Sequence, residues 1–414
     1  MKVVHLTTWS TQGGAARAAY RLHQGLQREG VHSRVLAKIK DENDDTVIEW
    51  DRARSLPTKA AVFFREHWKR FRLRRYSETR PDGVDVFSQA WTAEGTAVAH
   101  ALPDADVYHL HWINEFIDPK PFFKATDAPV VWTLHDMNPF TGGCHYNAQC
   151  RKFEEQCGAC PQLGSDDTTD LSRTVWKRKL KAYQTAIQQD RLHVVSPSNW
   201  LAEEADSSAL FGHASVDVIP HGLDIGTFCP RNTDGIRKAL EIPKGHRIVL
   251  FVADYSTRRK GFDLLTSALK LEEAENVMLV SIGSDQPEME TEQPHLHLGR
   301  IESDTLLSVF YSLADLFVIP SRQEAFGQTA LEAMACGTPV VGFEVGGIPD
   351  MVRPGETGWL AASESARALR EAIEAALSDE AERERTGQRC REVVEEEYAL
   401  GVQAKRYKYL YDRI

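Results

Sequence analysis

Short apolar runs of strand length alternate with helical segments along most of this chain. The runs are rich in Val, Ile and Leu, which is typical of strands buried on both faces of a parallel sheet. We expect strands at 3–7, 33–39, 105–112, 128–136, 191–198 and 214–222, and again at 247–254, 277–283, 295–299, 315–321 and 338–346. The alternation predicts an α/β fold in which helices cover both faces of parallel sheets.

The alternation occurs twice, and 414 residues exceed what one hydrophobic core usually supports. We therefore expect two Rossmann-like domains with a cleft between them, at 1–225 and 226–394. The turn-rich stretch 221–243 predicts the linker.

The composition excludes several classes of protein. A net charge of −11 argues against a general nucleic-acid binder. No apolar run reaches the roughly 18–20 residues of a membrane span. The N-terminal MKVVHLTTWS predicts a short strand rather than a signal peptide, and seven cysteines do not fit a disulfide scaffold in a chain of this length. We expect a cytoplasmic protein.

The stretch 313–341 places Glu324 and Glu332 eight residues apart around one strand-to-helix turn. Glu324 follows a predicted buried strand, at the sheet edge where open α/β sheets bind ligands. Glu332 lies about one turn inside a helix that begins near Gly327 and ends before Gly337. Two carboxylates beside a helix N-terminus suit a sugar joined to a phosphate. The expected anion-binding residues are Ala325, Phe326, Gly327, Gln328 and Thr329.

The segment EAFGQTALE resembles the Glu-x7-Glu signature of retaining glycosyltransferases of family 4, and the surrounding VIPSRQEAFGQTALEAMACGTPVVGFEVGGIPDMV is similar to that family's pattern. The resemblance, which points to polysaccharide or colanic-acid-type members, implies the GT-B fold, with two parallel sheets facing a central cleft. It implies an N-terminal acceptor-side domain, a C-terminal nucleotide-sugar-binding domain, and a helix at about 395–414 that packs back on the first domain. Glu324 would then bind hydroxyls of the transferred sugar, and Glu332 those of the ribose.

A basic turn, TRRKGFDLL, follows the predicted strand 247–254. Arg258, Arg259 and Lys260 beside Gly261 predict a site for the donor diphosphate, where their charge would stabilise the leaving group. The family pattern has an Arg several residues before Lys-Gly, but position 255 is Tyr, so Arg259 or Arg258 takes that role. A solvated basic turn is the alternative.

Three further positions lie at strand ends. Gly13 and Gly14 begin the first βα turn, which lacks the G-x-G-x-x-G fingerprint and so argues against NAD or FAD. In the family this turn faces the donor diphosphate and the acceptor; a plain tight turn is the alternative. Gly283 ends a strand where a nucleotide can approach the sheet, or serves the turn alone. His135 ends the strand 128–136, where the family has a His near the donor sugar, whereas His109 and His111 are weaker candidates.

Four cysteines form the pattern Cys-x5-Cys-x6-Cys-x2-Cys: Cys144, Cys150, Cys157 and Cys160. Four thiols within so short a segment predict a structural Zn²⁺ site that closes a long loop, with His145 as a spare ligand. Uncoordinated thiols, redox-paired thiols and an iron–sulfur cluster are the alternatives. Polysaccharide-type members of the family resemble this chain in the insertion GGCHY…C…CG-x-CP.

The segment 63–76 combines arginines with Phe64, Trp68 and Phe71 at helical spacing. A basic helix with an aromatic stripe is typical of contact with an anionic membrane surface, here the inner face of the membrane. The spacing favours the alternative, in which the aromatics pack on the domain and the arginines are solvated.

Together these features predict a retaining glycosyltransferase of hexosyltransferase type that uses a nucleotide-diphosphate sugar and needs no divalent metal for catalysis. Its expected acceptor is a glycan or a lipid-linked saccharide in polysaccharide biosynthesis. The predicted catalytic residues are Glu324, His135, Lys260 and Arg259. The alternatives are a sugar-nucleotide 2-epimerase of the same fold, a glycan phosphorylase and a non-enzymatic sugar-nucleotide-binding protein.

Overall fold

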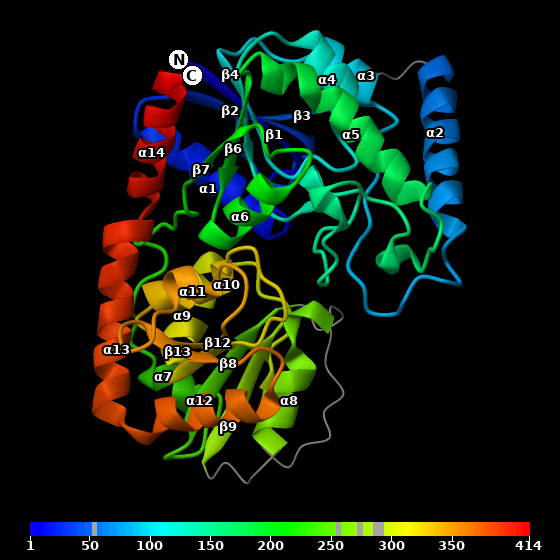
Figure 1. Cartoon of the computed structure of the whole chain (residues 1–414). Helices are drawn as coiled ribbons and strands as arrows, with labels where there is room; N and C mark the ends of the chain where they lie inside the picture. Colours follow the sequence, from blue (N-terminus) through cyan, green and yellow to red (C-terminus); the bar gives the residue numbers. More distant parts are fainter. Residues whose placement is uncertain (52–55, 254–257, 271–275, 285–293) are drawn as a thin grey trace. The chain divides into compact units, whose positions relative to one another are not determined.

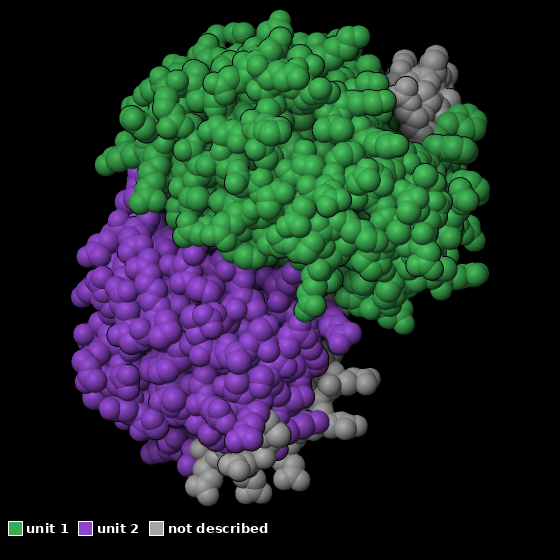
Figure 2. All heavy atoms as spheres, in the orientation of Figure 1, with its two compact units in different colours: residues 1–220, 403–414 green, residues 221–402 purple. Residues whose placement is uncertain are grey.

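The computed structural model describes residues 1–51, 56–253, 258–270, 276–284 and 294–414 (Figure 1). The chain forms two compact units, which Figure 2 distinguishes by colour. Unit 1 comprises residues 1–220 and 403–414, and unit 2 comprises residues 221–402. In the described ranges, no helix is long and apolar enough to cross a membrane.

Unit 1 contains a seven-stranded sheet in the order β3-β2-β1-β4-β5-β6-β7, and every pairing is parallel. The strands are β1 (Lys2–Trp9), β2 (His32–Ile39), β3 (Val47–Glu49), β4 (Val107–Leu110), β5 (Val130–Thr133), β6 (Leu192–Ser196) and β7 (Ser215–Val218). The helices are α1 (Gly14–Arg28), α2 (Leu56–Arg74), α3 (Gly95–His100), α4 (Pro119–Ala125), α5 (Leu171–Gln188) and α6 (Asn199–Ser207). The strand order reverses between β1 and β4, which is the switch point where open α/β sheets bind ligands.

The C-terminal helix α14 (Leu400–Arg413) completes the core of unit 1 from residue 403 onward (Figure 1). Tyr407 and Leu410 pack with Val3 of β1 and Leu26 of α1 in one buried cluster. The helix also reaches the sheet through a polar contact, because the Tyr407 hydroxyl shares a hydrogen bond of 2.6 Å with the Thr133 hydroxyl. Burial of these apolar side chains anchors the end of the chain to unit 1.

Unit 2 contains a six-stranded parallel sheet in the order β10-β9-β8-β11-β12-β13. The strands are β8 (Arg247–Val252), β9 (Val277–Ile282), β10 (His295–His297), β11 (Leu316–Ile319), β12 (Val340–Phe343) and β13 (Gly358–Ala361). The helices are α7 (Asp234–Ala239), α8 (Phe262–Lys270), α9 (Asp304–Leu313), α10 (Gln328–Ala335), α11 (Ile348–Met351), α12 (Ala366–Ser378) and α13 (Glu380–Val393). Here the switch point lies between β8 and β11.

Both faces of the unit 2 sheet are buried, as the apolar runs of the sequence predict. Side chains of β8 alternate between two clusters, because successive residues of a strand point to opposite faces. Ile248 and Leu250 pack in the cluster that includes α9 and α10, whereas Val249 and Phe251 pack in the cluster that includes α8 and α12. The prediction of two parallel α/β sheets is confirmed.

Three predictions about the organisation of the chain need correction. The stretch 221–243 is not a linker, since Leu223, Phe228 and Ile242 are buried in the core of unit 2. The short strands β3 and β13 are absent from the predicted set. The units divide at 220/221 and 402/403, whereas the sequence placed the divisions at 225/226 and 394/395.

Candidate active site

Two loops meet at the switch point of the unit 2 sheet, beyond the carboxyl ends of β8 and β11. Gly261 has a φ of +71°, and a Cβ at this position would lie 1.8 Å from the carbonyl oxygen of Pro320. The backbone N–H of Arg322 donates to the carbonyl oxygen of Arg259 over 2.7 Å. Glycine is therefore required at 261, because it lets the basic turn lie directly against the loop that carries Glu324.

The carboxylate of Glu324 is buried where these loops meet. Lys260 Nζ donates to Glu324 Oε2 over 2.6 Å, the Ser321 hydroxyl donates to the same oxygen over 3.3 Å, and the Arg259 guanidinium lies 3.7 Å from it. Burial alone would raise the pKa of Glu324, but the charges of Lys260 and Arg259 outweigh burial and hold that pKa below its ordinary value. Glu324 is therefore a carboxylate anion between two cations.

The helix that follows Glu324 begins where the sequence predicts. Gly327 precedes α10 with a φ of +101°, and Gly337 follows the helix with a φ of +78°. Ala325 and Phe326 are buried in the connecting loop, whereas Gln328 and Thr329 in the first turn are partly exposed. The positive end of the helix dipole is thus next to the Glu324 loop, as a diphosphate site requires.

Glu332 lies one turn inside α10 and is 4% exposed. The hydroxyl group of Tyr311, from α9, donates to Glu332 Oε2 over 2.9 Å. Tyr311 is itself fully buried, so this contact fixes the orientation of the Glu332 carboxylate.

The other predicted donor-side residues occupy different surroundings. The Arg258 side chain is exposed, whereas the Arg259 guanidinium also donates to the carbonyl oxygen of Gln323 over 3.0 Å, so Arg259 is the arginine that faces the Glu324 loop. Gly283 follows β9, and its N–H donates to the carbonyl oxygen of Gly299 over 3.2 Å. Tyr255 lies outside the described residues.

Sequence reasoning missed residues that support this loop from outside the Glu-x7-Glu segment. A Cβ at Gly346, where φ is +55°, would lie 2.0 Å from the carbonyl oxygen of Glu324. The N–H of Gly347 donates to that same oxygen over 2.9 Å. The adjacent glycines after strand β12 were the available signal, since a glycine pair at a strand end indicates close approach of another backbone segment.

In unit 1, Gly13 and Gly14 lie at the start of α1, beside the switch point of that sheet. Gly13 has a φ of +88°, which favours glycine, and no described atom lies within 4 Å of where its Cβ would be. Both glycines are exposed. This turn therefore has the open surface that close approach of a ligand requires, and Gly13 is explained by its backbone conformation.

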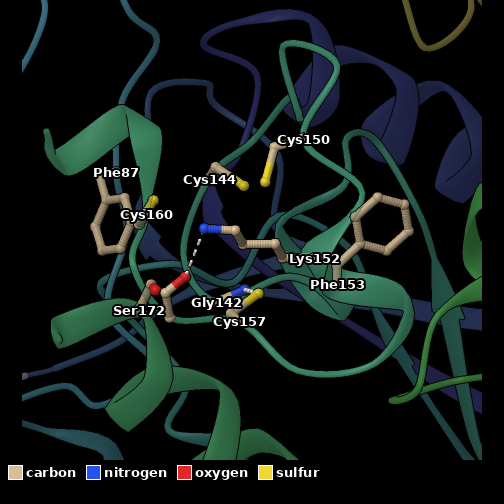
Figure 3. A pocket seen from close by; sticks show the side chains of 10 residues that line it. Phe87, Gly142, Cys144, Cys150, Lys152, Phe153, Cys157, Cys160 and Ser172 are labelled. Atoms are coloured by element: carbon tan, nitrogen blue, oxygen red, sulfur yellow. Dashed lines mark hydrogen bonds between the residues drawn. The ribbon is translucent and has the colours of Figure 1, made fainter. Parts of the chain in front are cut away.

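The four cysteines of the predicted metal site line one cavity in unit 1 (Figure 3). Phe87, Phe153 and Lys152 complete its wall, and the thiols are not joined in disulfides. Burial raises the pKa of Cys144, and neighbouring thiols raise it further. His145 is not part of this cavity lining: its ring nitrogens contact Asp136 Oδ2 at 2.7 Å and the Ser88 hydroxyl at 2.8 Å. The prediction of His145 as a spare ligand is therefore wrong.

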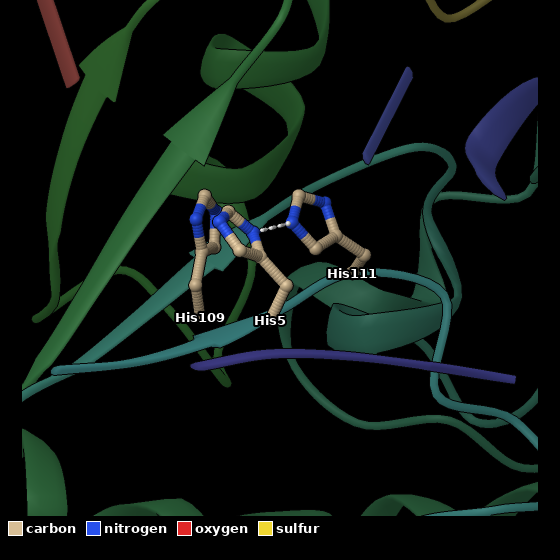
Figure 4. Close-up of side chains that lie close together, drawn as sticks. All are labelled: His5, His109 and His111. Atoms are coloured by element: carbon tan, nitrogen blue, oxygen red, sulfur yellow. Dashed lines mark hydrogen bonds between the residues drawn. The ribbon is translucent and has the colours of Figure 1, made fainter. Parts of the chain in front are cut away.

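His135 lies just beyond β5 and ends a row of hydrogen-bonded imidazoles. His135 Nε2 is 3.1 Å from His111 Nδ1. His111 Nε2 is in turn 2.9 Å from His5 Nδ1, and Figure 4 draws this second contact. Burial lowers the pKa of His135 to about 4, so the ring is neutral at physiological pH. A neutral imidazole can donate or accept a hydrogen bond but does not supply positive charge.

Three of the buried histidines have donor nitrogens within 4.8 Å of one another: His5, His109 and His111. His109 is already satisfied, because one ring nitrogen is 2.7 Å from the Tyr411 hydroxyl and the other is 2.7 Å from the Thr133 hydroxyl. A metal ion would have to break these contacts and the His5–His111 contact. We interpret the group as a hydrogen-bonded core.

The aromatic stripe of α2 is not packed on the domain, contrary to the favoured alternative. Phe64, Trp68 and Phe71 are 71%, 62% and 57% exposed. The opposite side of the helix holds it to unit 1, since Lys69 Nζ is 3.0 Å from Glu115 Oε1 and the Arg72 guanidinium lies 4.4 Å from the centre of the Trp91 ring. The helix therefore contacts unit 1 through these cationic side chains and through Leu73, and it exposes its aromatic face.

Comparisons with known proteins agree with this architecture. The family model described as “Glycosyltransferase Family 4” matches residues 12–227, and the one described as “Glycosyl transferases group 1” matches residues 232–393. D-inositol 3-phosphate glycosyltransferase 1 of Catenulispora acidiphila is 34% identical over 202 residues, which cover 44% of this chain and 48% of that protein. The corresponding protein of Mycolicibacterium gilvum is 33% identical over 198 residues, which cover 44% of this chain and 43% of that protein. The chain thus spans less than half the length of these relatives.

Solved structures are similar over the whole chain. Sucrose-phosphate synthase from Thermosynechococcus elongatus has a TM-score of 0.67 at 20% identity, covering 100% of this chain and 98% of that one. Anabaena HepE in complex with UDP-glucose has a TM-score of 0.65 at 14% identity, covering 100% of both chains. At such identities the similarity shows the fold, which is GT-B. With a family model matched across residues 12–227, the chain belongs to glycosyltransferase family 4.

Proposed function

We propose that this chain is a retaining hexosyltransferase that moves a sugar from a nucleotide-diphosphate sugar to a glycan or lipid-linked saccharide in polysaccharide biosynthesis. The observation that carries the proposal is the group formed by Glu324, Lys260 and Arg259 at the unit 2 switch point. It combines a carboxylate for sugar hydroxyls with cations for phosphate, beside a helix N-terminus.

The contacts of Glu324 suit a role in holding the sugar. In the described residues, all three side-chain contacts of Glu324 go to Oε2, which leaves Oε1 to accept a hydrogen bond from a sugar hydroxyl. Glu332 is oriented by Tyr311 and binds the ribose hydroxyls. His135, as a neutral imidazole, contacts the donor sugar near the reacting centre. The structurally similar HepE was solved in complex with UDP-glucose, which supports a nucleotide sugar as the donor.

Lys260, Arg259 and the start of α10 stabilise the charge that develops on the diphosphate as the glycosidic bond breaks. Fixed cations in a partly buried site need little reorganisation during the reaction, so we propose that catalysis does not require a divalent ion. Initial rates should then be unchanged when Mg²⁺ and Mn²⁺ are omitted and EDTA is added with the substrates. A rate that depends on added Mg²⁺ or Mn²⁺ would contradict this part of the proposal.

The identity of the acceptor is tested with three kinds of molecule. The curated relatives are named for D-inositol 3-phosphate, so this compound belongs beside oligosaccharide and lipid-linked acceptors. The experiment incubates the protein with UDP-, GDP-, ADP- and dTDP-sugars and each acceptor, and then determines the anomeric configuration of the product by NMR. We expect a glycoside that keeps the donor configuration. An inverted product would refute retention, and a released epimer of the donor sugar would favour the epimerase.

We also propose that α2 contacts an anionic membrane surface in the cytoplasm. Its exposed aromatic residues are flanked by the exposed Arg70, Arg74 and Arg75, so apolar insertion and electrostatic attraction act from one surface. The protein should float with vesicles that contain phosphatidylglycerol and not with vesicles of phosphatidylcholine alone. A variant with Phe64→Ser and Trp68→Ser should lose flotation without losing stability, because both side chains are largely exposed. Equal flotation of both proteins would contradict the assignment.

A further inference from the structure

The cysteine cavity lies in a long segment with little regular structure. Between β5 and α5 the chain contains only three short 3-10 turns in this described stretch, at Asn138–Phe140, Lys152–Glu154 and Pro161–Leu163. Loops of this length in a compact unit usually serve a function or are held by additional bonds. The four thiols are placed so that they can supply such bonds.

The backbone has unusual conformations beside the cysteines that line the cavity. In Cys157-Gly158-Ala159-Cys160, Gly158 has a φ of +142° and Ala159 a φ of +45°, and these conformations reverse the chain between the two cysteines. A non-glycine residue in this region costs roughly 1 kcal/mol, so Ala159 is held there by its surroundings. Gln149, which precedes Cys150, also has a positive φ, of +69°.

One hydrogen-bond donor faces a sulfur atom of the cavity. The N–H of Gly142 donates to Cys157 Sγ over 3.1 Å, and this bond is drawn in Figure 3. Such a donor favours a thiolate over a thiol at Cys157, since a neutral thiol is only a weak acceptor. The backbone at two other cysteines is held in place, because the N–H of Leu163 donates to the carbonyl oxygen of Cys160 over 3.1 Å and the Thr141 hydroxyl donates to that of Cys144 over 2.6 Å.

Two lysines provide positive charge beside the cavity. Lys152 lines its wall, and Lys179 is 3% exposed and interacts electrostatically with Cys144, Cys157 and Asp136. The closest contacts of Lys179 Nζ are with neutral oxygens, including the carbonyl oxygen of Thr141 at 3.1 Å. One divalent cation with four thiolates carries a charge of −2, and the two lysines would offset part of that charge.

We propose that Cys144, Cys150, Cys157 and Cys160 bind one Zn²⁺ ion as a tetrathiolate site that fixes the segment between β5 and α5. Four S–H bonds break, four protons pass to solvent, and four Zn–S bonds form, with no change in oxidation state. The cavity has a volume of about 20 Å³, which is enough for one ion. No three of these sulfurs lie within 4.8 Å of one another in the described residues, so binding of the ion requires the side chains to rotate about their Cα–Cβ bonds.

The test measures metal in the full-length protein purified without chelator. Elemental analysis should find one zinc per chain in the wild type and in Cys229→Ser, whose thiol lies outside the cavity. Cys157→Ser and Cys160→Ser should retain less than a tenth of that zinc. Protein refolded with Co²⁺ should show the intense visible absorption of a tetrahedral cobalt–thiolate site, and the two cavity variants should not.

A second measurement keeps the proposal testable if the cavity variants fail to fold. Titration of the wild-type protein with an organomercurial should release one zinc as the cavity thiols react, detected with a metal-sensitive dye. Absence of zinc from the wild type together with no cobalt spectrum would overturn the proposal. So would iron in place of zinc, cavity cysteines found as disulfides by mass spectrometry, or full zinc occupancy in Cys157→Ser. These outcomes are independent of glycosyl transfer, so failure of the zinc proposal is distinguishable from failure of the proposed function.

Discussion

Gly261→Ala tests how the donor-side residues are held in place. The new Cβ would lie 1.8 Å from the carbonyl oxygen of Pro320, whereas ordinary contact begins at 3.4 Å. The two loops must therefore separate by on the order of 1.5 Å, which strains the Arg322–Arg259 backbone hydrogen bond and moves Lys260 relative to Glu324. The left-handed backbone conformation costs about 1–2 kcal/mol and the overpacking a further 1–3 kcal/mol, so we expect a loss of about 2–5 kcal/mol in the free energy of unfolding.

Gly245→Ala is the matched control. Gly245 also has a positive φ, of +81°, but no described atom lies within 4 Å of where its Cβ would be. This variant should lose only the backbone term of about 1–2 kcal/mol. Denaturant unfolding measures stability, and nucleoside diphosphate release measures activity. Misplacement of about 1 Å near reacting groups costs on the order of 100-fold in rate, so Gly261→Ala should lose activity under conditions where it remains folded. Equal stability and equal activity of the two variants would refute the reasoning.

Two further predictions concern buried polar groups. Burial lowers the pKa of His23 and of His135 to about 4, so both are neutral when folded, and the unfolded chain takes up protons below its pKa of about 6.5. Their contribution to stability is therefore complete above about pH 6.5 and declines as the pH falls toward about 4, by up to about 3 kcal/mol for each histidine. The variant His23→Gln should make the urea midpoint of unfolding depend less steeply on pH. An unchanged slope would count against this prediction. The variant Tyr311→Phe removes a hydrogen-bond donor from the buried Glu332 carboxylate and should lower the free energy of unfolding by about 1–3 kcal/mol. The control Tyr409→Phe, at a residue 70% exposed, should leave that free energy almost unchanged. Coincident unfolding curves of the two variants would contradict this prediction.

The strand-to-helix turns were predictable because their signals are local. Buried runs such as LFVI of β11 and the glycines around α10 define where a strand ends and a helix begins. Since carboxyl ends of parallel strands share one edge, the sequence also predicted that Lys260 and Glu324 would be on the same edge. The contact of Gly261 with Pro320 depends on the path of two loops and has no local signal, whereas the contact of Gly346 with Glu324 was indicated only by the adjacent glycines after β12.

The errors have physical causes as well. The stretch 221–243 contains turn residues typical of a linker, but three apolar side chains, Leu223, Phe228 and Ile242, are enough to bury it in unit 2. Strands β3 (VIE) and β13 (GWLA) contain a charged residue and a glycine, so they lack the continuous apolar run by which a strand such as LFVI was predicted. The aromatic residues of α2 have the spacing of a helix that faces a core, but spacing alone does not show which side of a helix packs against the rest of the protein.

The measurement that tests the central claim most directly is nucleoside diphosphate release from a panel of nucleotide sugars, with and without acceptor, by the wild type, Glu324→Ala and Glu332→Ala. Each variant removes a carboxylate whose hydrogen bonds to ligand hydroxyls contribute about 1.5–3 kcal/mol, so we expect kcat/KM to fall at least about tenfold in each. Unchanged turnover in both variants would contradict the placement of the donor site at the unit 2 switch point.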